Sequence, residues 1–355
     1  MMRISRVQLI TLVASSVIAN GILSLPQVAA GIGGPGGWLV VVAVGLYSVI
    51  QILFLALVCR RFPNVNFIDL TKKVLGGFTG TIIAVLLIIY FTLLASLVAR
   101  GVANAGNTTV YTSTPPLVLM GVMVLISVYA VYHGLEVLAR VNLILFVIKM
   151  LIFFPVMLVI LPQVDWGNLL PLWERGTISW VEGLLNIQSS FAGFIIFAFA
   201  YPHLQNPKGG VLAGIYALVS VTIVYTIVTV LAILVFSSEE VARMNWPVIF
   251  LIRVVAVPVD APYMAFWVAS AFSVISSSIF MACYTLEKLF KLRDYRYFLP
   301  PLAVIVIAVA LIPKSNLETA TFAVNLAYLG ASFEWVLPMV LLVMAVIGNK
   351  RETPA

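Results

Sequence analysis

The sequence predicts an all-α integral membrane protein built from about ten transmembrane helices. Hydrophobic residues make up 63% of the 355 positions and charged residues only 9%, whereas a soluble domain carries about a quarter charged residues. Apolar runs bounded by charges or turn residues supply ten candidate spans. Each half contains five spans. Because five is an odd number, the second half enters the membrane from the opposite side, which indicates an inverted five-plus-five repeat of the kind found in transporters.

The ten spans form a single transmembrane domain that covers residues 1–355. We assign residues 7–161 to the first five-helix repeat and residues 183–348 to the second. The stretch 316–331 belongs either to the last span or to a separate interfacial piece. The predicted spans lie near 7–31, 37–59, 79–103, 116–132, 138–161, 183–202, 210–236, 262–286, 298–313 and 332–348.

Positive charge is distributed unevenly between the two sides of these spans. With the N-terminus in the cytoplasm, most of the 20 lysine and arginine residues fall in inside segments, as the positive-inside rule requires. Both termini are therefore predicted to be cytoplasmic. The net charge of +7 is explained by this orientation, so no nucleic-acid partner is expected. Two cysteines and two histidines give no disulfide framework and no metal-binding pattern.

The first span contains a signal for an interruption near its middle, where Asn20 and Gly21 follow Ala19. Both are weak helix formers, and Pro26 lacks the amide that would bond to the carbonyl of Ile22. We expect a break between Asn20 and Leu23, with a half-helix from about Ser24 whose positive N-terminal end suits a carboxylate. A proline-kinked helix without a ligand is the alternative.

The sixth span, the counterpart of the first, carries a weaker signal. Its middle holds small and hydroxylated residues, Ser189, Ser190 and Ala192, followed by Gly193. This composition permits local unwinding, and it equally suits a small-residue face for helix packing. Interruptions at corresponding positions of two repeats favour a binding site near the membrane midplane.

Lys149 lies deep in the fifth span, where a charged lysine costs roughly 2.5–3.5 kcal/mol. An ionisable group at that depth suggests function, so we expect it to carry a coupled proton or to occupy the place of a bound cation. A structural lysine satisfied by the broken first span is the alternative. Ser270, Ser273 and Ser277 share one face of the eighth span. We group Ser273 and Ser277 with Lys149 as ion- or proton-coupling candidates, with ordinary helix packing as the alternative.

Several motifs together resemble those of a known family. The run Gly21–Pro26 is similar to the G-x-L-x-L-P signature in the first span of the amino acid–polyamine–organocation transporters. Three further segments resemble the endospore-germination permeases, which are the B subunits of germinant receptors. These segments are Leu170-Pro171-Leu172-Trp173-Glu174-Arg175-Gly176, Trp246-Pro247, and Tyr328-Leu329-Gly330 with Pro338. The resemblance covers essentially the whole chain.

This resemblance implies the fold of the bacterial leucine transporter, in which unwound parts of spans 1 and 6 hold an amino acid. It also implies that Lys149 matches a lysine that replaces a sodium ion in proton-coupled members. The expected partners are an A-type membrane subunit and a C-type lipoprotein, in the inner membrane of an endospore. With the adjoining residues Ala19 and Ser190, the predicted ligand-binding positions are Ala19, Asn20, Gly21, Ile22, Leu23, Ser190, Phe191, Ala192 and Gly193.

Three functions are consistent with these features. The first is a nutrient sensor that binds a small amino acid and signals to partner subunits. The second is a proton-coupled amino-acid transporter of the same fold, and the third is a structural membrane subunit with a vestigial pocket. We predict no enzymatic activity and no cofactor. Small side chains at Ala19, Gly21, Ala192 and Gly193 favour a ligand of alanine-like or modest aliphatic size.

Overall fold

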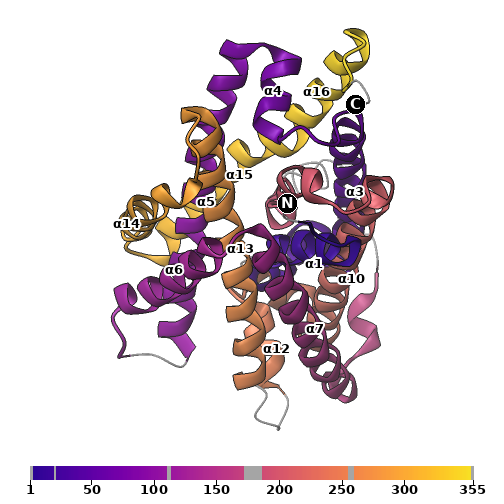
Figure 1. Cartoon of the computed structure of the whole chain (residues 1–355). Helices are drawn as coiled ribbons and strands as arrows, with labels where there is room; N and C mark the ends of the chain where they lie inside the picture. The colour runs from indigo at the N-terminus through magenta and orange to yellow at the C-terminus, as the bar shows by residue number, and fades with distance from the viewer. Residues whose placement is uncertain (1–2, 20, 110–112, 172–185, 255–259, 353–355) are drawn as a thin grey trace.

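The computed structural model describes residues 3–19, 21–109, 113–171, 186–254 and 260–352, and these are almost entirely helical (Figure 1). Each of the ten predicted spans is represented by at least one helical segment in the described residues. The α-helices are α1 Arg6–Val17, α2 Gly21–Gly33, α3 Gly37–Arg61, α4 Phe67–Leu75, α5 Gly77–Thr109, α6 Pro116–Tyr132, α7 Leu135–Ile160, α9 Ile196–Ala200, α10 Gly210–Phe236, α11 Ser238–Arg243, α12 Pro247–Arg253, α13 Asp260–Phe290, α14 Leu299–Ala310, α15 Asn316–Ala331 and α16 Leu337–Ile347.

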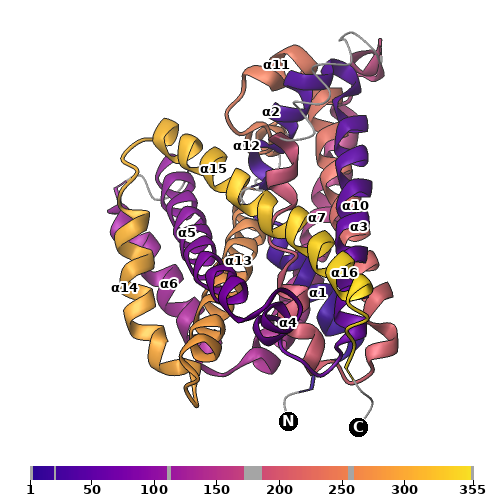
Figure 2. The same cartoon turned by 90° about the horizontal axis from the view of Figure 1, so that it is seen from above.

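The two chain ends lie at the same end of the bundle (Figure 2). The amide of Ile4 donates to the carbonyl of His203 at 2.8 Å. The ammonium of Lys350 donates to the carbonyl of Val74 at 3.0 Å. Segments that the charge pattern assigned to one side of the membrane therefore meet at one end of the molecule.

The first span is interrupted between α1 and α2. A capping box starts α1, because the Ser5 hydroxyl accepts from the amide of Gln8 and the Gln8 side chain accepts from the amide of Ser5. The helix ends at Val17, since Ile18 has an extended backbone. The break is confirmed but lies earlier than expected, because α2 begins at Gly21 and not near Ser24. Ile22 and Leu23 therefore belong to the first turn of a helix.

The sixth span is interrupted over a longer stretch. A short 3₁₀ turn, Ser189–Phe191, is followed by Ala192 in an extended conformation. Gly193 has a φ of +109°, a conformation that side-chain-bearing residues rarely adopt. The chain turns through residues 192–195 before α9 begins at Ile196. The small-residue composition of this segment thus marks a real interruption.

The tenth span begins well before residue 332. Helices α15 and α16 are joined without a gap by a π-helical turn, Ser332–Val336, and Figure 2 shows them as one long yellow rod. The membrane-length apolar helix covers Glu318–Ile347. The stretch 316–331 therefore belongs to the last span, and Glu334 lies near the middle of that span. A π turn inside an α-helix frequently marks a functional site.

Candidate functional site

The two helix interruptions meet inside the bundle. A Cβ atom added to Gly21 would lie 2.8 Å from the Cβ of Ser190, and one added to Gly193 would overlap the carbonyl oxygen of Ser16. Glycine at both positions is thus required by close approach of the two segments. Gly21, Ser190 and Ala192 keep partial solvent exposure, and the adjoining Ser189 is exposed, so an accessible surface remains where the breaks touch.

Tyr225 on α10 joins the two interruptions directly. Its buried hydroxyl oxygen lies 3.2 Å from the carbonyl oxygen of Val17 and 3.0 Å from that of Ser190. Its ring packs edge to face on Phe191, with ring centroids 5.1 Å apart and planes at 83°. The chain therefore places a hydroxyl donor between the last carbonyl of α1 and a carbonyl of the broken sixth span.

Lys149 on α7 is fully buried and contacts the last turn of α1. Its ammonium donates to the hydroxyl of Ser15 at 3.0 Å. The last turn of a helix carries the partial negative charge of its free carbonyls, which favours a cation there. Lys149 therefore contacts the first span through a side chain of α1, and whether it serves proton coupling or only structure stays a prediction.

The serine face of α13 reaches the same turn. The hydroxyls of Ser277 and Ser16 lie 2.7 Å apart and share a hydrogen bond. Ser273 instead donates to the carbonyl of Ala269, within its own helix. Among the described residues, no hydrogen bond joins Lys149 to Ser273 or Ser277. The grouping of these three residues as one coupling site remains a prediction, with only Lys149 and Ser277 bound to adjacent residues of α1.

Glu334, in the π turn of the last span, is a residue whose role the sequence left open. It is buried, and its Oε1 accepts a hydrogen bond from the amide of Gly193 at 2.6 Å. This contact supplies an acceptor for the backbone amide of Gly193 in the second break, and it links the last span to the sixth span. The missed signal was a carboxyl group near the centre of an apolar helix, which indicates function by default.

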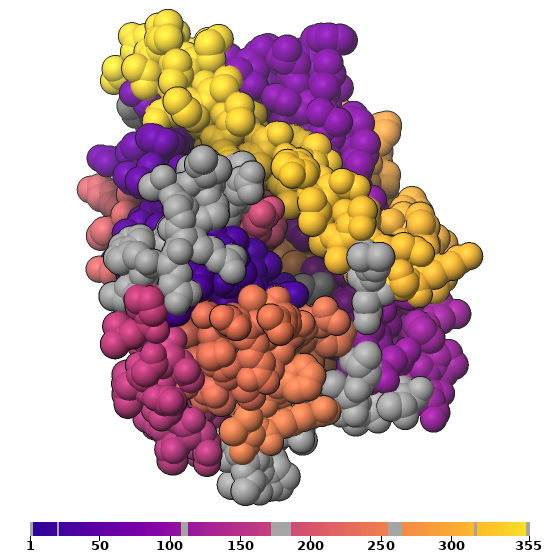
Figure 3. Space-filling model, turned by 180° about the vertical axis from the view of Figure 1, so that it is seen from behind, coloured from indigo at the N-terminus to yellow at the C-terminus, as the bar shows by residue number. Residues whose placement is uncertain are grey.

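A cavity of about 690 Å³ leads from one end of the bundle toward the first break. Figure 3 shows a hollow between the salmon-coloured α11–α12 segment and the yellow last span, with indigo residues of the first span inside it. Leu23 and Ser24 of α2 line this vestibule, together with Trp246 and Trp267. Of the predicted ligand-binding residues that the structure describes, Leu23 is the one that borders it.

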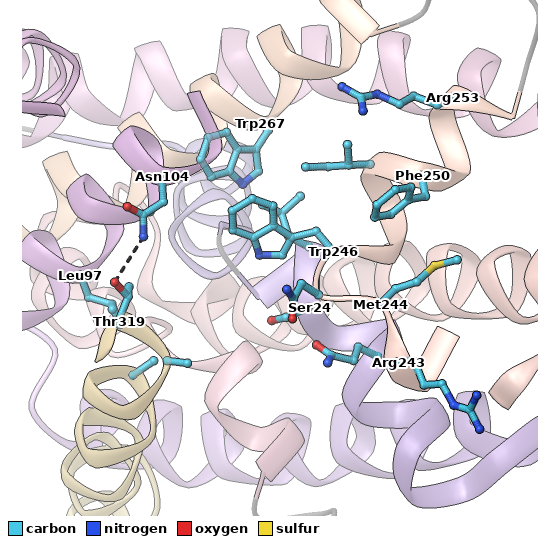
Figure 4. A pocket seen from close by; sticks show the side chains of 17 residues that line it. Ser24, Leu97, Asn104, Arg243, Met244, Trp246, Phe250, Arg253, Trp267 and Thr319 are labelled. Carbon is cyan, nitrogen blue, oxygen red and sulfur yellow. Dashed lines mark hydrogen bonds between the residues drawn. The ribbon is translucent and has the colours of Figure 1, made fainter. Parts of the chain in front are cut away.

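The described residues that line the vestibule include two arginines at its rim and no acidic residue (Figure 4). Arg243 and Arg253 come from α11 and α12, at the end opposite the chain termini. Across the vestibule, the amide of Asn104 donates to the hydroxyl of Thr319 at 3.2 Å, linking the third and last spans. This rim suits a solute that carries a carboxylate.

The predicted ligand-binding residues are therefore distributed in two layers. Leu23 lies at the vestibule, whereas Gly21, Ser190 and Gly193 lie where the two breaks touch. Ala19, Ile22 and Phe191 are buried in the core, and Ala192 is partly exposed beside them. Asn20 lies outside the described residues.

A family profile described as "Spore germination protein" matches residues 3–319. The chain belongs to this family. It is similar to spore germination protein YndE of Bacillus subtilis (strain 168), at 23% identity over 97% of this chain and 96% of the relative. It is also similar to spore germination protein B2 of the same organism, at 24% identity over 82% and 81% of the two chains.

Solved structures of transporters share the fold of this spore germination family member. MhsT in complex with L-phenylalanine aligns with a TM-score of 0.72 and 14% identity, over 99% of this chain and 90% of MhsT. Mhp1, a nucleobase-cation-symport-1 family transporter, aligns with a TM-score of 0.68 and 12% identity, over 96% and 79%. The predicted leucine-transporter type of fold is confirmed. The chain is a multi-pass membrane protein of the germinant-receptor or permease type.

Proposed function

We propose that this chain is the amino-acid-sensing membrane subunit of a spore germinant receptor. A small amino acid binds where the interruptions of spans 1 and 6 meet, and it reaches this position through the vestibule. The observation that carries the proposal is the contact of two helix breaks at small residues, Gly21 against Ser190, close to the vestibule that Leu23 and Ser24 line. Broken helices near the midplane are the common binding element of this transporter architecture.

The chemistry of the site supports an amino acid as ligand. The first turn of α2 is a helix N-terminus, whose partial positive charge suits a carboxylate. The amide of Ile22 already donates to the carbonyl of Ala19 at 3.3 Å, so the attraction there comes from the helix end as a whole. The end of α1 carries partial negative charge, which favours an ammonium group nearby. MhsT, which shares the fold, was solved with L-phenylalanine bound, and the small residues here favour a smaller side chain.

Signalling in this proposal passes to an A-type membrane subunit and a C-type lipoprotein in the inner membrane of the spore. Both termini face the cytoplasm, and the vestibule with Arg243 and Arg253 faces the opposite side. The ligand acts by its higher affinity for one arrangement of the bundle, since only differential affinity shifts a conformational equilibrium. The two repeats, 7–161 and 183–348, are the elements that rearrange.

Binding of labelled amino acids to the purified protein tests this function. We expect saturable binding by the wild type and none by Gly21→Leu, because a side chain at Gly21 collides with Ser190. Gly121→Leu is the matched control, since no atom lies within 4 Å of a Cβ at that glycine. Absence of saturable binding to the wild type across a panel of amino acids would remove the proposal.

Proton-coupled transport is the second candidate function, favoured by the buried Lys149 beside the first break. In reconstituted vesicles, a transporter takes up amino acids against their gradient when a pH gradient is applied. A sensor binds them without such uptake. Uphill uptake that Lys149→Met abolishes would identify a transporter.

A further inference from the structure

Tyr225 differs from the other buried or half-buried tyrosines whose hydroxyls contact the backbone. Tyr295 donates to one carbonyl, that of Val131, at 2.8 Å, and Tyr201 donates to one carbonyl, that of Pro207, at 3.0 Å. The Tyr225 hydroxyl reaches two carbonyls, and they come from two different interrupted spans.

Both of these carbonyls lie where a helical segment stops. Val17 is the last residue of α1, and Ser190 is in the 3₁₀ turn that precedes the extended Ala192. Carbonyls at such ends have no partner in their own helix and carry partial negative charge. In carriers with interrupted helices, unwound carbonyls and half-helix ends coordinate the coupled Na⁺ or proton. The place between Val17 and Ser190 thus has the chemistry of a cation site.

We propose that the Tyr225 hydroxyl occupies the place of a cation between the two interruptions, so that the ligand-competent arrangement forms without Na⁺. The inference rests on the proposed function and adds to it: Tyr225 is a positioning residue that holds the two breaks together, and nutrient binding is independent of sodium. A hydroxyl has one proton for the two carbonyls, which makes it a weaker link than a metal ion. Such a link suits a sensor whose breaks must separate and rejoin.

Two substitutions separate the role of the Tyr225 hydroxyl as a hydrogen-bond donor from its role as the group that fills a cation's place. Tyr225→Phe removes the donor and keeps the ring, which leaves two buried carbonyls without their hydroxyl partner. Tyr225→Asn removes the ring, opens space beside both carbonyls and adds a side-chain oxygen that can bind a cation. Tyr295→Phe is the matched control, because it removes the same kind of hydroxyl–carbonyl bond away from both breaks.

The experiment compares purified wild type and variants in sodium chloride and in choline chloride of equal ionic strength. Without ligand, we expect the melting temperature of Tyr225→Asn to be a few degrees higher in sodium, because an ion that binds only the folded state stabilises it. The wild type and Tyr295→Phe should melt alike in both salts. In binding assays with labelled amino acids, Tyr225→Phe should lose about tenfold in affinity, which corresponds to one hydrogen bond of about 1.4 kcal/mol.

Each other result overturns the inference. A wild type whose melting temperature or amino-acid affinity depends on sodium contradicts it, as does a Tyr225→Phe protein with wild-type affinity. A folded Tyr225→Asn protein that is indifferent to sodium contradicts the assignment of a cation's place. If Tyr225→Asn does not fold, Tyr225→Ser supplies the same space with a hydroxyl oxygen. A wild type that binds no amino acid would remove the proposed function, while the melting comparison without ligand would still decide this inference.

Discussion

The two interruptions are stabilised by different chemistry. Around the first break the partners are donors or hydroxyls: Lys149 binds Ser15, Ser277 binds Ser16 and Tyr225 reaches the carbonyl of Val17. Around the second break one partner is a carboxyl group, because Glu334 accepts from the amide of Gly193. Of these contacts at the first break, one involves a backbone carbonyl and two involve side-chain hydroxyls. At the second break the contacts involve a backbone carbonyl and a backbone amide.

This difference follows from the length of each interruption. The first lies between the end of α1 at Val17 and the start of α2 at Gly21, so the amides beyond it belong to a regular helix end. The second runs through an extended residue and a glycine with positive φ. A buried amide there cannot reach a helix partner and requires an acceptor from elsewhere in the protein. The last span supplies it through its π turn, which makes the second break the one that depends on a distant helix.

The largest effect on amino-acid binding should come from Gly193→Ala, which changes the backbone of the second break itself. A left-handed conformation costs a residue with a Cβ about 1–2 kcal/mol, and the added Cβ overlaps the Ser16 carbonyl. We expect loss of measurable amino-acid binding and a lower melting temperature. Gly121→Ala, in the open, helical surroundings of α6, should bind normally. Wild-type affinity in Gly193→Ala would show that the close approach of the breaks is unimportant.

Lys149→Met tests the first break and should separate function from stability. A lysine in the apolar core opposes folding by roughly 2.5–3.5 kcal/mol on insertion scales, and methionine fills a similar volume without that cost. We expect an unchanged or higher melting temperature together with about tenfold weaker amino-acid binding, because the last turn of α1 loses its contact at Ser15. Lys314→Met, on the exposed surface, provides the control. Normal binding in Lys149→Met would make the lysine a purely structural feature.

Glu334→Ala and Glu334→Gln together measure what the carboxyl contributes at the second break. Alanine leaves the buried Gly193 amide without its acceptor, which costs about 1–3 kcal/mol. Glutamine keeps an acceptor oxygen at the same position. Thermal unfolding should therefore show a clear loss for alanine and a smaller one for glutamine. Equal losses in the two variants would mean that the charge of the carboxylate, and not the hydrogen bond, matters.

The smallest effect should come from Ser277→Ala, which removes one hydroxyl contact at the first break. Loss of its bond to Ser16 should cost about 1 kcal/mol in unfolding free energy. Ser278 is the matched control, since its buried hydroxyl has no hydrogen-bond partner among the described residues. Ser278→Ala should be neutral or slightly stabilising. A reversed order of the two variants would contradict the contact that joins α13 to α1.

The sequence was most informative where the signal was local. Apolar runs located the spans, and Asn20-Gly21 with Pro26 located the first break to within a few residues, because weak helix formers act on their own backbone. The break started earlier than expected because Pro26 is tolerated inside α2, at the loss of a single hydrogen bond. Gly193 also carried its signal locally, through the conformation that only glycine adopts readily.

Long-range contacts were harder to predict. The partner of Gly193 is 141 positions away at Glu334, and the predicted start of the last span at residue 332 placed that glutamate at the membrane surface. Because α15 and α16 form one continuous helix, Glu334 lies at the middle of the last span. A buried carboxyl group at that depth needs a hydrogen-bond partner. Tyr225 sits in a largely apolar run whose polar residues are threonines, so only the fold reveals that its hydroxyl lies between two carbonyls. Lys149 was found from sequence because a charge in an apolar span is conspicuous.

Protection of a cysteine at Ser190 from chemical labelling tests whether an amino acid binds where the two breaks meet. The native Cys59 and Cys283 are buried, so Ser190→Cys, which is partly exposed, should be the main site of reaction with a small maleimide. An amino acid that raises the melting temperature of this variant should slow its labelling and leave Lys314→Cys unaffected. An unchanged labelling rate at Ser190→Cys, under conditions where the ligand still raises the melting temperature, would place the bound amino acid elsewhere in the protein.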